Sequence, residues 1–359
     1  MKKLSKILAL VLAAVLAFGS MTVFAGEAEG EPMKIGVVLT FTENGYGLTV
    51  KQYLDAIGEE LNIEFNYAAA QETEAMNQAL ENYAAAGVKG IITMPTFNTL
   101  NELEFCEQND MYYAICGTVP KDEIYQQIKD NPYFAGAVGN DDAASTLGMV
   151  HVLAEKYGVK KLGLVSLPMG TSDMHDGRYA GVKQGVEETG IELVAEGLAY
   201  NLTESSQNMV AQYPDLDAII ALAGGIEECM QPIIAAGKQD TMKFAGFREE
   251  AGAEDLFETG ALATLGVGTP INAVFAFINL YNAITGQPLY TEGACSHVLD
   301  TIYVSSADEY LTYVHGAMDQ NPYTVDQIKE HLKAFNPDAT KEAFEEFMDG
   351  YNLEYLAQK

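Results

Sequence analysis

Residues 134–166 read FAGAVGNDDAASTLGMVHVLAEKYGVKKLGLVS. The apolar run from Phe134 to Val138 predicts a buried strand. Asp141 to Tyr157 predict a helix, which Gly158 closes because glycine readily adopts the left-handed conformation that ends helices. Lys161 to Ser166 form a second apolar run and predict a second strand. A strand, a helix and a strand in this order indicate an α/β unit of a parallel sheet.

Similar units precede and follow this stretch. Their predicted strands are continuous apolar runs, as parallel strands covered on both faces are. Two successive series of such units, the second beginning at Phe134, indicate two Rossmann-like α/β lobes joined by hinge strands. We expect lobe 1 to comprise residues 34–118 and 248–304, and lobe 2 residues 119–247. The other predicted strands are Lys34 to Leu39, Asn62 to Tyr67, Gly90 to Thr93, Met111 to Cys116, Ile191 to Ala199, Ala218 to Leu222, Lys243 to Phe247 and Ala261 to Gly266.

The two ends of the chain differ from this pattern. Three lysines, an apolar run from Ile7 to Phe18 and the letters VFA at residues 23–25 are typical of a cleaved signal peptide over residues 1–25. An uncleaved membrane anchor is the alternative. The acidic, glycine-rich residues 26–33 predict a disordered leader. Residues 305–359 predict a helical extension that packs against one lobe, with a partner-docking surface as the alternative.

The charge of the chain limits its possible partners, and its cysteines bear on anchoring and disulfide formation. A formal net charge of −31 argues against binding to nucleic acid and to anionic membranes. The first cysteine is Cys106, so no cysteine follows the signal peptide to carry a lipid anchor. Cys106 and Cys116 are predicted at opposite ends of a helix–strand unit, beyond the roughly 7 Å that a disulfide spans. We therefore expect four free, mostly buried thiols.

Candidate ligand-binding residues follow the predicted strands, because parallel α/β sheets bind ligands at the carboxyl ends of their strands. The segments at these positions are polar, aromatic and glycine-rich, as the walls of a site for a small polar molecule are. The expected binding residues in lobe 1 are Phe41, Asn44, Tyr46, Thr96 and Thr118, together with Arg248, and those in lobe 2 are Asp141, Asp173, Arg178, Gly225 and Glu227.

The densest polar cluster is SDMHDGRYAG, residues 172–181. Asp173, His175 and Asp176 could suggest a metal site, but the other histidines are scattered and a catalytic zinc needs three placed ligands. No nucleophile elbow, phosphate loop or dinucleotide fingerprint is present, so we expect no enzyme activity, metal or cofactor. Arg178, in the first turn of a predicted helix, offers a planar fork of donors to a ligand. An ordinary salt bridge to Asp173 or Asp176 is the alternative role.

The order of these segments resembles the type I periplasmic binding proteins of ABC importers, in the sugar-binding-like branch. The resemblance covers residues 34–303. It is carried by KIGVVLTF, AGVKGIITMPT (86–96), residues 138–166, RYAGVKQGVEETGIELV (178–194), YPDLDAIIALAGG (213–225), AAGKQDTMKFAGF (235–247) and the strand at 260–265.

The resemblance implies roles for individual residues. Arg178 matches the ligand-contacting arginine of the family motif R-x-x-G-F, with Val182 in place of phenylalanine. Phe41 and Tyr46 match the aromatic residues that stack on sugar. The family's Gly-Phe-Asp is here Gly246-Phe247-Arg248, which replaces an acceptor of sugar hydroxyls with a cation. Arg178 and Arg248 together suggest a ligand with a carboxylate or another anionic group.

We therefore expect an exported, monomeric solute-binding protein, periplasmic or extracellular, with no lipid anchor or membrane-inserted segment in the mature chain. It would capture a small polar ligand, sugar-like or anionic, between its lobes and deliver it to a membrane ABC permease. A binding protein that reports ligand to a membrane receptor is one alternative. An enzyme that uses Asp173, His175 and Arg178 is another.

Overall fold

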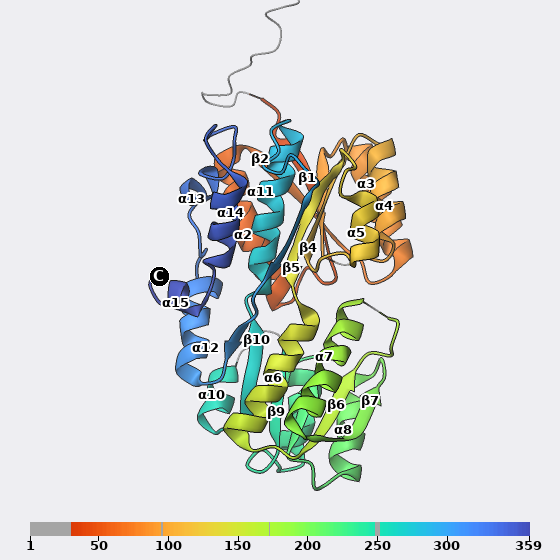
Figure 1. The fold of residues 1–359 in the computed structure, drawn as a ribbon, viewed down its shortest axis with the longest axis vertical. Helices are drawn as coiled ribbons and strands as arrows, with labels where there is room; N and C mark the ends of the chain where they lie inside the picture. Colours follow the sequence, from red (N-terminus) through yellow and green to blue (C-terminus); the bar gives the residue numbers. More distant parts are fainter. Residues whose placement is uncertain (1–29, 95, 172, 248–251) are drawn as a thin grey trace, which may run out of the picture. The chain divides into compact units, whose positions relative to one another are not determined.

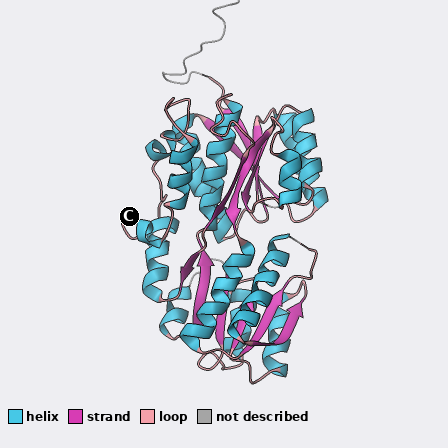
Figure 2. Ribbon diagram, in the orientation of Figure 1, coloured by secondary structure: helices cyan, strands magenta, loops and turns pink. Residues whose placement is uncertain are grey.

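The computed structural model describes residues 30–94, 96–171, 173–247 and 252–359. The chain divides into two units between Pro32 and Met33, and residues 33–359 form a compact unit. Every described helix and strand belongs to the second unit, drawn in Figures 1 and 2. The predicted signal peptide and the first half of the predicted leader, residues 26–29, lie outside the described residues.

Lobe 1 is built on a parallel sheet, here called sheet A, whose strands lie in the order β11-β5-β4-β3-β1-β2. Its strands are β1 (Met33–Leu39), β2 (Ile63–Ala69), β3 (Gly90–Thr93), β4 (Tyr112–Gly117), β5 (Phe134–Asn140) and β11 (Cys295–Leu299). Its helices are α2 (Gly45–Leu61), α3 (Thr73–Ala86), α4 (Thr99–Gln108), α5 (Asp122–Ile128) and α11 (Asn272–Ile284).

Lobe 2 is built on sheet B, in the order β12-β10-β9-β8-β6-β7, in which only β12 runs antiparallel to its neighbour. Its strands are β6 (Lys161–Ser166), β7 (Glu192–Leu198), β8 (Ala218–Ala221), β9 (Lys243–Phe247), β10 (Leu262–Val267) and β12 (Ile302–Val304). Its helical segments are α6 (Asp142–Tyr157), α7 (Asp173–Thr189), α8 (Leu202–Gln212), the π-helical turn η1 (Ile226–Met230), α9 (Gln231–Ala235) and α10 (Ala253–Glu258).

The two strands of residues 134–166 belong to different sheets. β5 pairs with β4 and β11 in sheet A, whereas β6 pairs with β7 and β8 in sheet B, so α6 connects the lobes. The expected lobe boundaries at 118/119 and 247/248 therefore differ from those of the structure, in which β5 belongs to lobe 1 and β10 and β12 to lobe 2. A continuous apolar run fits any parallel strand covered on both faces, so the run does not specify its sheet.

The chain crosses between the lobes three times, and one side chain connects the crossings. They follow β5, β10 and β11, and the second includes the 3-10 turn η2 (Thr269–Ile271). Asn140, at the end of β5, donates from Nδ2 to the carbonyl oxygens of Leu299 and Asp300, 3.2 and 3.3 Å away. Asn272, at the start of α11, donates to Asn140 Oδ1 at 3.0 Å. These two amides hold the three crossings side by side.

We expect Asn272→Ala to lower the free energy of unfolding by about 1–3 kcal/mol, because a buried hydrogen-bond partner of Asn140 is lost. Thermal and urea unfolding of the variant and the parent chain measure the change. Asn82→Ala, at an exposed position of α3, is the control and should change stability by less than about 0.5 kcal/mol. Equal stability of all three proteins would contradict a structural role for the amide pair.

The C-terminal extension covers α11, in which residues 272–282 are all buried. The ring of Phe275 lies 5.7–6.5 Å from those of Tyr323, Phe344, Phe347 and Tyr351. This extension, blue in Figure 1, comprises α12 (Ala307–Tyr313), η3 (Val314–Met318), α13 (Val325–Lys329), α14 (Lys341–Asp349) and α15 (Leu353–Leu356).

The extension contacts both lobes rather than one. In lobe 2, α12 packs on α10, with the rings of Phe257 and Tyr310 6.0 Å apart. In lobe 1, Lys329 forms an ion pair with Glu60 of α2 at 2.9 Å. The expected helical extension is confirmed, but the expectation that it packs against a single lobe is wrong, because the crossing from β11 to β12 delivers the chain to lobe 2 before it returns.

Candidate functional site

The segments that follow β4 and β6 meet, although they belong to different sheets. Lys121, four residues beyond the end of β4, forms an ion pair at 2.6 Å with Asp173, the first residue of α7. Both side chains are largely exposed. The carboxyl ends of the strands of lobes 1 and 2 therefore approach each other, which is the arrangement that the sequence predicts for a ligand site.

Arg178 is the most closely held polar side chain among the described residues of these strand ends. Its Nε donates to Asp142 Oδ1 at 3.0 Å, and its Nη1 donates to the carbonyl oxygen of Leu222, just beyond β8, at 3.0 Å. The guanidinium carbon lies 3.7 Å from the centroid of the Phe247 ring at the end of β9. Only 12% of each side chain of the Arg178–Asp142 pair is exposed. A planar cation with three such contacts has a fixed orientation.

Helix packing places Arg178 at this point. Helices α6 and α7 lie in close contact, because a Cβ on Gly181 would lie only 2.0 Å from the carbonyl oxygen of Ala143. Thr146 Oγ1 also donates to the carbonyl oxygen of Arg178 at 2.6 Å. The second and third turns of α7 thus lie against the start of α6, and Arg178 reaches Asp142 across this contact.

Burial shifts the pKa values of two groups around the guanidinium. It raises the pKa of Asp142 to about 6, an effect that the nearby charge of Arg178 partly opposes. It lowers the pKa of His175 to about 4, and Arg178 contributes in the same direction. The imidazole is therefore neutral at neutral pH, and its Nδ1 is buried without a hydrogen-bond partner among the described residues. An electrostatic role for His175 as a cation is excluded at this pH.

The raised pKa of Asp142 makes the fold less stable as the pH rises from about 4 to about 6. The stabilising contribution of the neutral carboxyl is complete below the ordinary pKa of 3.8 and is lost as the pH rises through about 6. Asp142→Asn removes this loss, so we expect the variant's stability relative to the parent chain to rise by up to about 3 kcal/mol between pH 4 and pH 6.5.

Thermal unfolding of both proteins across that range measures the difference. His175 is present in both, so its opposite dependence on pH cancels. The loss of one partner of Arg178 adds an offset that is constant with pH, because arginine stays charged. A difference that does not change between pH 4 and pH 6.5 would contradict a raised pKa at Asp142.

The structure gives the predicted residues of lobe 1 different roles. Phe41 is exposed in the loop after β1. Asn44 caps α2 by accepting from Gly47 N at 2.9 Å. Tyr46 packs against the core, beside the Cys116 thiol at the end of β4.

Two glycines allow backbone segments near these residues to lie in close contact. A Cβ on Gly47 would lie 2.4 Å from the carbonyl oxygen of Phe41, so Gly47 closes its own loop. A Cβ on Gly139 of β5 would lie 2.4 Å from the backbone of Thr118, so that residue and β5 are in close contact. Thr96 is half-buried after β3. Arg248 lies outside the described residues.

The predicted residues of lobe 2 divide between the site and its surroundings. Asp141 caps α6 through Ala144 N at 2.9 Å and is exposed. Gly225 donates from its backbone to Glu228 Oε2 at 2.9 Å, and Glu227 is exposed in the turn that follows β8. Neither alternative partner of Arg178 pairs with it, since Asp173 binds Lys121 and Asp176 accepts from Gly170 N. Around Arg178, the structure gathers Asp142, Phe247 and Leu222 instead.

Two side chains of this group were missing from the predicted set. Asp141 was predicted as a binding residue and Asp142 was not. In the structure Asp141 caps α6, whereas Asp142 binds Arg178. Phe247 ends a predicted strand, at the edge where ligands are expected, but is not among the expected binding residues. A signal for both was available in principle, because a nearly buried arginine needs a carboxylate and often stacks on an aromatic ring.

The geometry can be compared with known proteins. A family model described as a periplasmic binding protein domain matches residues 35–288. The chain belongs to this family. In this periplasmic binding protein the match runs from β1 to α11 and ends before β11, β12 and the C-terminal extension. No curated protein matches the sequence.

Solved structures show the same fold as this periplasmic binding protein at low sequence identity. An ABC transporter solute-binding protein from Actinobacillus succinogenes with bound D-allose is 17% identical, with a TM-score of 0.67 over 78% of this chain and 100% of that chain. One from Bacillus halodurans with bound myo-inositol is 16% identical, with a TM-score of 0.64 over 80% and 99%. A protein described as a LacI transcriptional regulator from Bacteroides fragilis is 13% identical, with a TM-score of 0.63 over 77% and 98%.

The prediction of a type I periplasmic binding protein fold, with two lobes on parallel sheets, is confirmed. All four cysteines are free and buried, as expected. Among the described residues, no helix is both long and apolar enough to span a membrane. Within the same ranges, no three His, Cys, Asp or Glu side chains come together as ligands for a metal ion.

Proposed function

We propose that this chain is an extracytoplasmic solute-binding protein that captures a small polar ligand between its two lobes and delivers it to a membrane ABC permease. The observation that carries the proposal is the position of Arg178. Its guanidinium is oriented by Asp142, Leu222 and Phe247 at the carboxyl ends of β8 and β9, where parallel α/β folds bind ligands. The family assignment and the bound sugars of the structural neighbours agree with this use of the fold.

The pairing of Arg178 narrows the proposed ligand class. Asp142 already neutralises much of the guanidinium charge, so the arginine offers directed donors with little net attraction for an anion. We therefore favour a neutral, hydroxyl-rich ligand, such as a sugar or cyclic polyol, over an anionic one. The acidic chain, with a net charge of −31, supports the same choice.

Export and partner choice follow from the same proposal. Residues 1–25 have the pattern of a signal peptide, and removal of this segment would leave a mature chain that begins near Gly26. Closure of the two lobes on ligand would give the permease a distinct conformation to recognise. We propose that the mature protein acts as a monomer.

The test begins with the mature chain and matched pairs of neutral and acidic ligands. Thermal shift with D-glucose, D-allose and myo-inositol is compared with D-glucuronate and D-galacturonate, because a ligand that binds only the folded chain raises its melting temperature. Calorimetry and small-angle scattering on each hit should show binding together with a smaller radius of gyration. Binding of the acids alone would reject the ligand class. No hit, with no compaction by any compound, would count against the function itself.

A further inference from the structure

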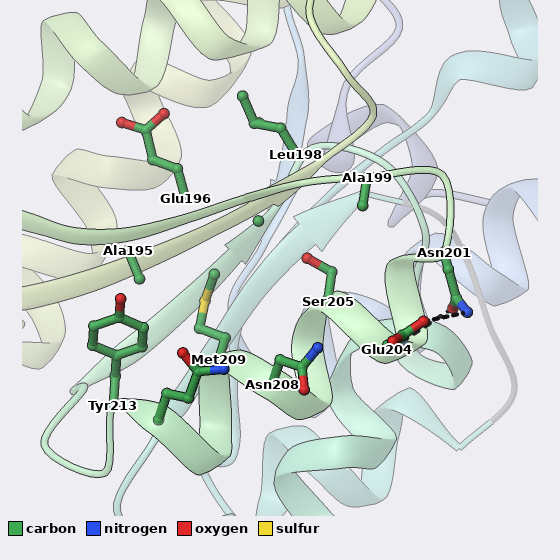
Figure 3. A pocket seen from close by; sticks show the side chains of 12 residues that line it. Ala195, Glu196, Leu198, Ala199, Asn201, Glu204, Ser205, Asn208, Met209 and Tyr213 are labelled. Atoms are coloured by element: carbon green, nitrogen blue, oxygen red, sulfur yellow. Dashed lines mark hydrogen bonds between the residues drawn. The ribbon is translucent and has the colours of Figure 1, made fainter.

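A groove lies on lobe 2 between β7 and α8, and it shares no residue with the Arg178 site. Its volume is about 410 Å³, and Figure 3 shows its walls. Strand β7 is at the edge of sheet B, so only one of its two sides pairs with a described strand. An edge strand keeps a row of peptide N–H and C=O groups available to another chain.

The backbone of β7 forms one wall. The side chains of Glu196 and Leu198 point away from α8 in Figure 3, so these residues contribute mainly main-chain atoms to the lining. The residues that alternate with them are small: Ala195, Gly197 and Ala199. A Cβ on Gly197 would lie 2.1 Å from Ser205 Oγ, so β7 and α8 are in contact at this position and a larger side chain here would disturb both walls of the groove.

One face of α8 forms the other wall. Ser205, Asn208 and Gln212 are spaced by three and four residues and therefore lie on the same face of the helix. Their side chains form no hydrogen bond with any described residue, and neither does the hydroxyl of Tyr213 at the end of the groove. Two amides and a hydroxyl opposite a strand edge can donate to and accept from the peptide groups of an inserted strand.

The charges of the groove select the kind of partner. Of the two carboxylates in the lining, Glu196 points away from α8 and pairs with Lys183 at 3.7 Å, so Glu204 supplies the charge of the groove, and no Lys, Arg or His is among the lining residues. Glu204 is bonded only to the amide of Asn201 among the described residues, so its charge is not neutralised by a cation. A second copy of this chain, with a net charge of −31, is repelled.

We propose that the groove between β7 and α8 binds an extended, neutral to basic peptide segment of another protein, which adds a strand to the edge of sheet B. The segment pairs its main chain with β7 and presents its outer peptide groups to Asn208 and Gln212. The stretch from Ala195 to Ala199 accommodates about five residues in extended conformation at roughly 3.3 Å per residue. Main-chain pairing supplies affinity, and the carboxylate of Glu204 selects a basic side chain.

A random heptapeptide library displayed on phage tests the proposal with the mature chain as bait. Counter-selection uses Gly197→Val, whose side chain fills the groove. We expect peptides that bind the parent chain and not the variant, rich in β-branched residues and in Lys or Arg. Synthetic copies should bind about 10- to 30-fold more weakly to the Asn208→Ala/Gln212→Ala double variant, as expected for two lost hydrogen bonds. N-methylation of alternate peptide amides should abolish binding.

Gln207→Ala, an exposed amide on α8 outside the groove, is the matched control and should leave peptide affinity unchanged. Thermal unfolding establishes that each variant is folded, and the double variant on the exposed helix face keeps the test valid if Gly197→Val is unstable. No peptide recovered above the counter-selected background would overturn the proposal. Selection of acidic peptides would also overturn it. So would the finding that the parent chain binds maltotriose and that Gly197→Val removes this binding, because the groove would then bind a sugar rather than a peptide. Sugar binding at the Arg178 site should be the same in every variant.

Discussion

Arg178→Ala is expected to weaken binding of the solute by about 10- to 150-fold, which corresponds to about 1.5–3 kcal/mol for hydrogen bonds from a charged group. The guanidinium is held by Asp142 and the carbonyl oxygen of Leu222 and stacks on Phe247, so its orientation is fixed before a ligand binds and binding carries little further cost of ordering. Titration calorimetry with the best ligand from the thermal-shift panel measures the change.

Two further variants test whether ligand affinity depends on the planar guanidinium or on contact between the lobes. Arg178→Lys keeps the charge but loses the planar fork, so it should recover only part of the affinity. Asp173→Asn breaks an exposed ion pair with Lys121 and should change affinity by less than about five-fold. Affinity that is unchanged in Arg178→Ala would remove this residue from the site. A loss of equal size in Asp173→Asn would assign the effect to contact between the lobes instead.

Phe344→Ala is expected to lower the free energy of unfolding by about 3–5 kcal/mol, the usual cost of removing a fully buried aromatic ring. Phe344 is 0% exposed and lies against Phe275 of α11 and His331 of the extension. The cavity would therefore open at the contact between the extension and lobe 1. Denaturant unfolding, followed by circular dichroism, measures the loss.

Phe335→Ala is the matched control, because it removes the same ring from the same extension at a position that is 45% exposed. Among the described residues, the ring of Phe335 contacts one other ring, that of Tyr281, at 6.2 Å. We expect it to cost less than about 1.5 kcal/mol. Similar stability of the two variants would mean that the extension is dispensable for the stability of lobe 1.

The presence of two α/β lobes could be predicted from sequence because apolar runs alternate with capped helices. The sequence could not predict which strands belong to which sheet. β5 and β6 read alike, and the contacts that separate them are with strands far away in sequence: β5 with Cys295 to Leu299, and β6 with Ala218 to Ala221. Local patterns carry no information about such pairings.

In the candidate site, too, local features could be predicted from sequence and long-range contacts could not. Arg178 was predicted because its position near the start of a helix that follows a strand is visible locally, although α7 begins five residues earlier than expected, at Asp173. Its partner was not, because Asp141 and Asp142 differ only in which of them faces α7, and that depends on the contact of Gly181 with Ala143. Phe247 was predicted as the end of a strand, but its stacking on Arg178 depends on the order of β8, β9 and β6 in sheet B.

The three crossings between the lobes determine when each lobe can be completed during synthesis. Sheet A lacks an edge strand until Cys295 to Leu299 have left the ribosome, and sheet B lacks one until Ile302 to Val304 have done so. Neither lobe is a continuous segment, so neither sheet can be completed before residues 295–304 have been made. A nascent chain of this topology therefore keeps one edge of each sheet open until synthesis reaches its last sixth.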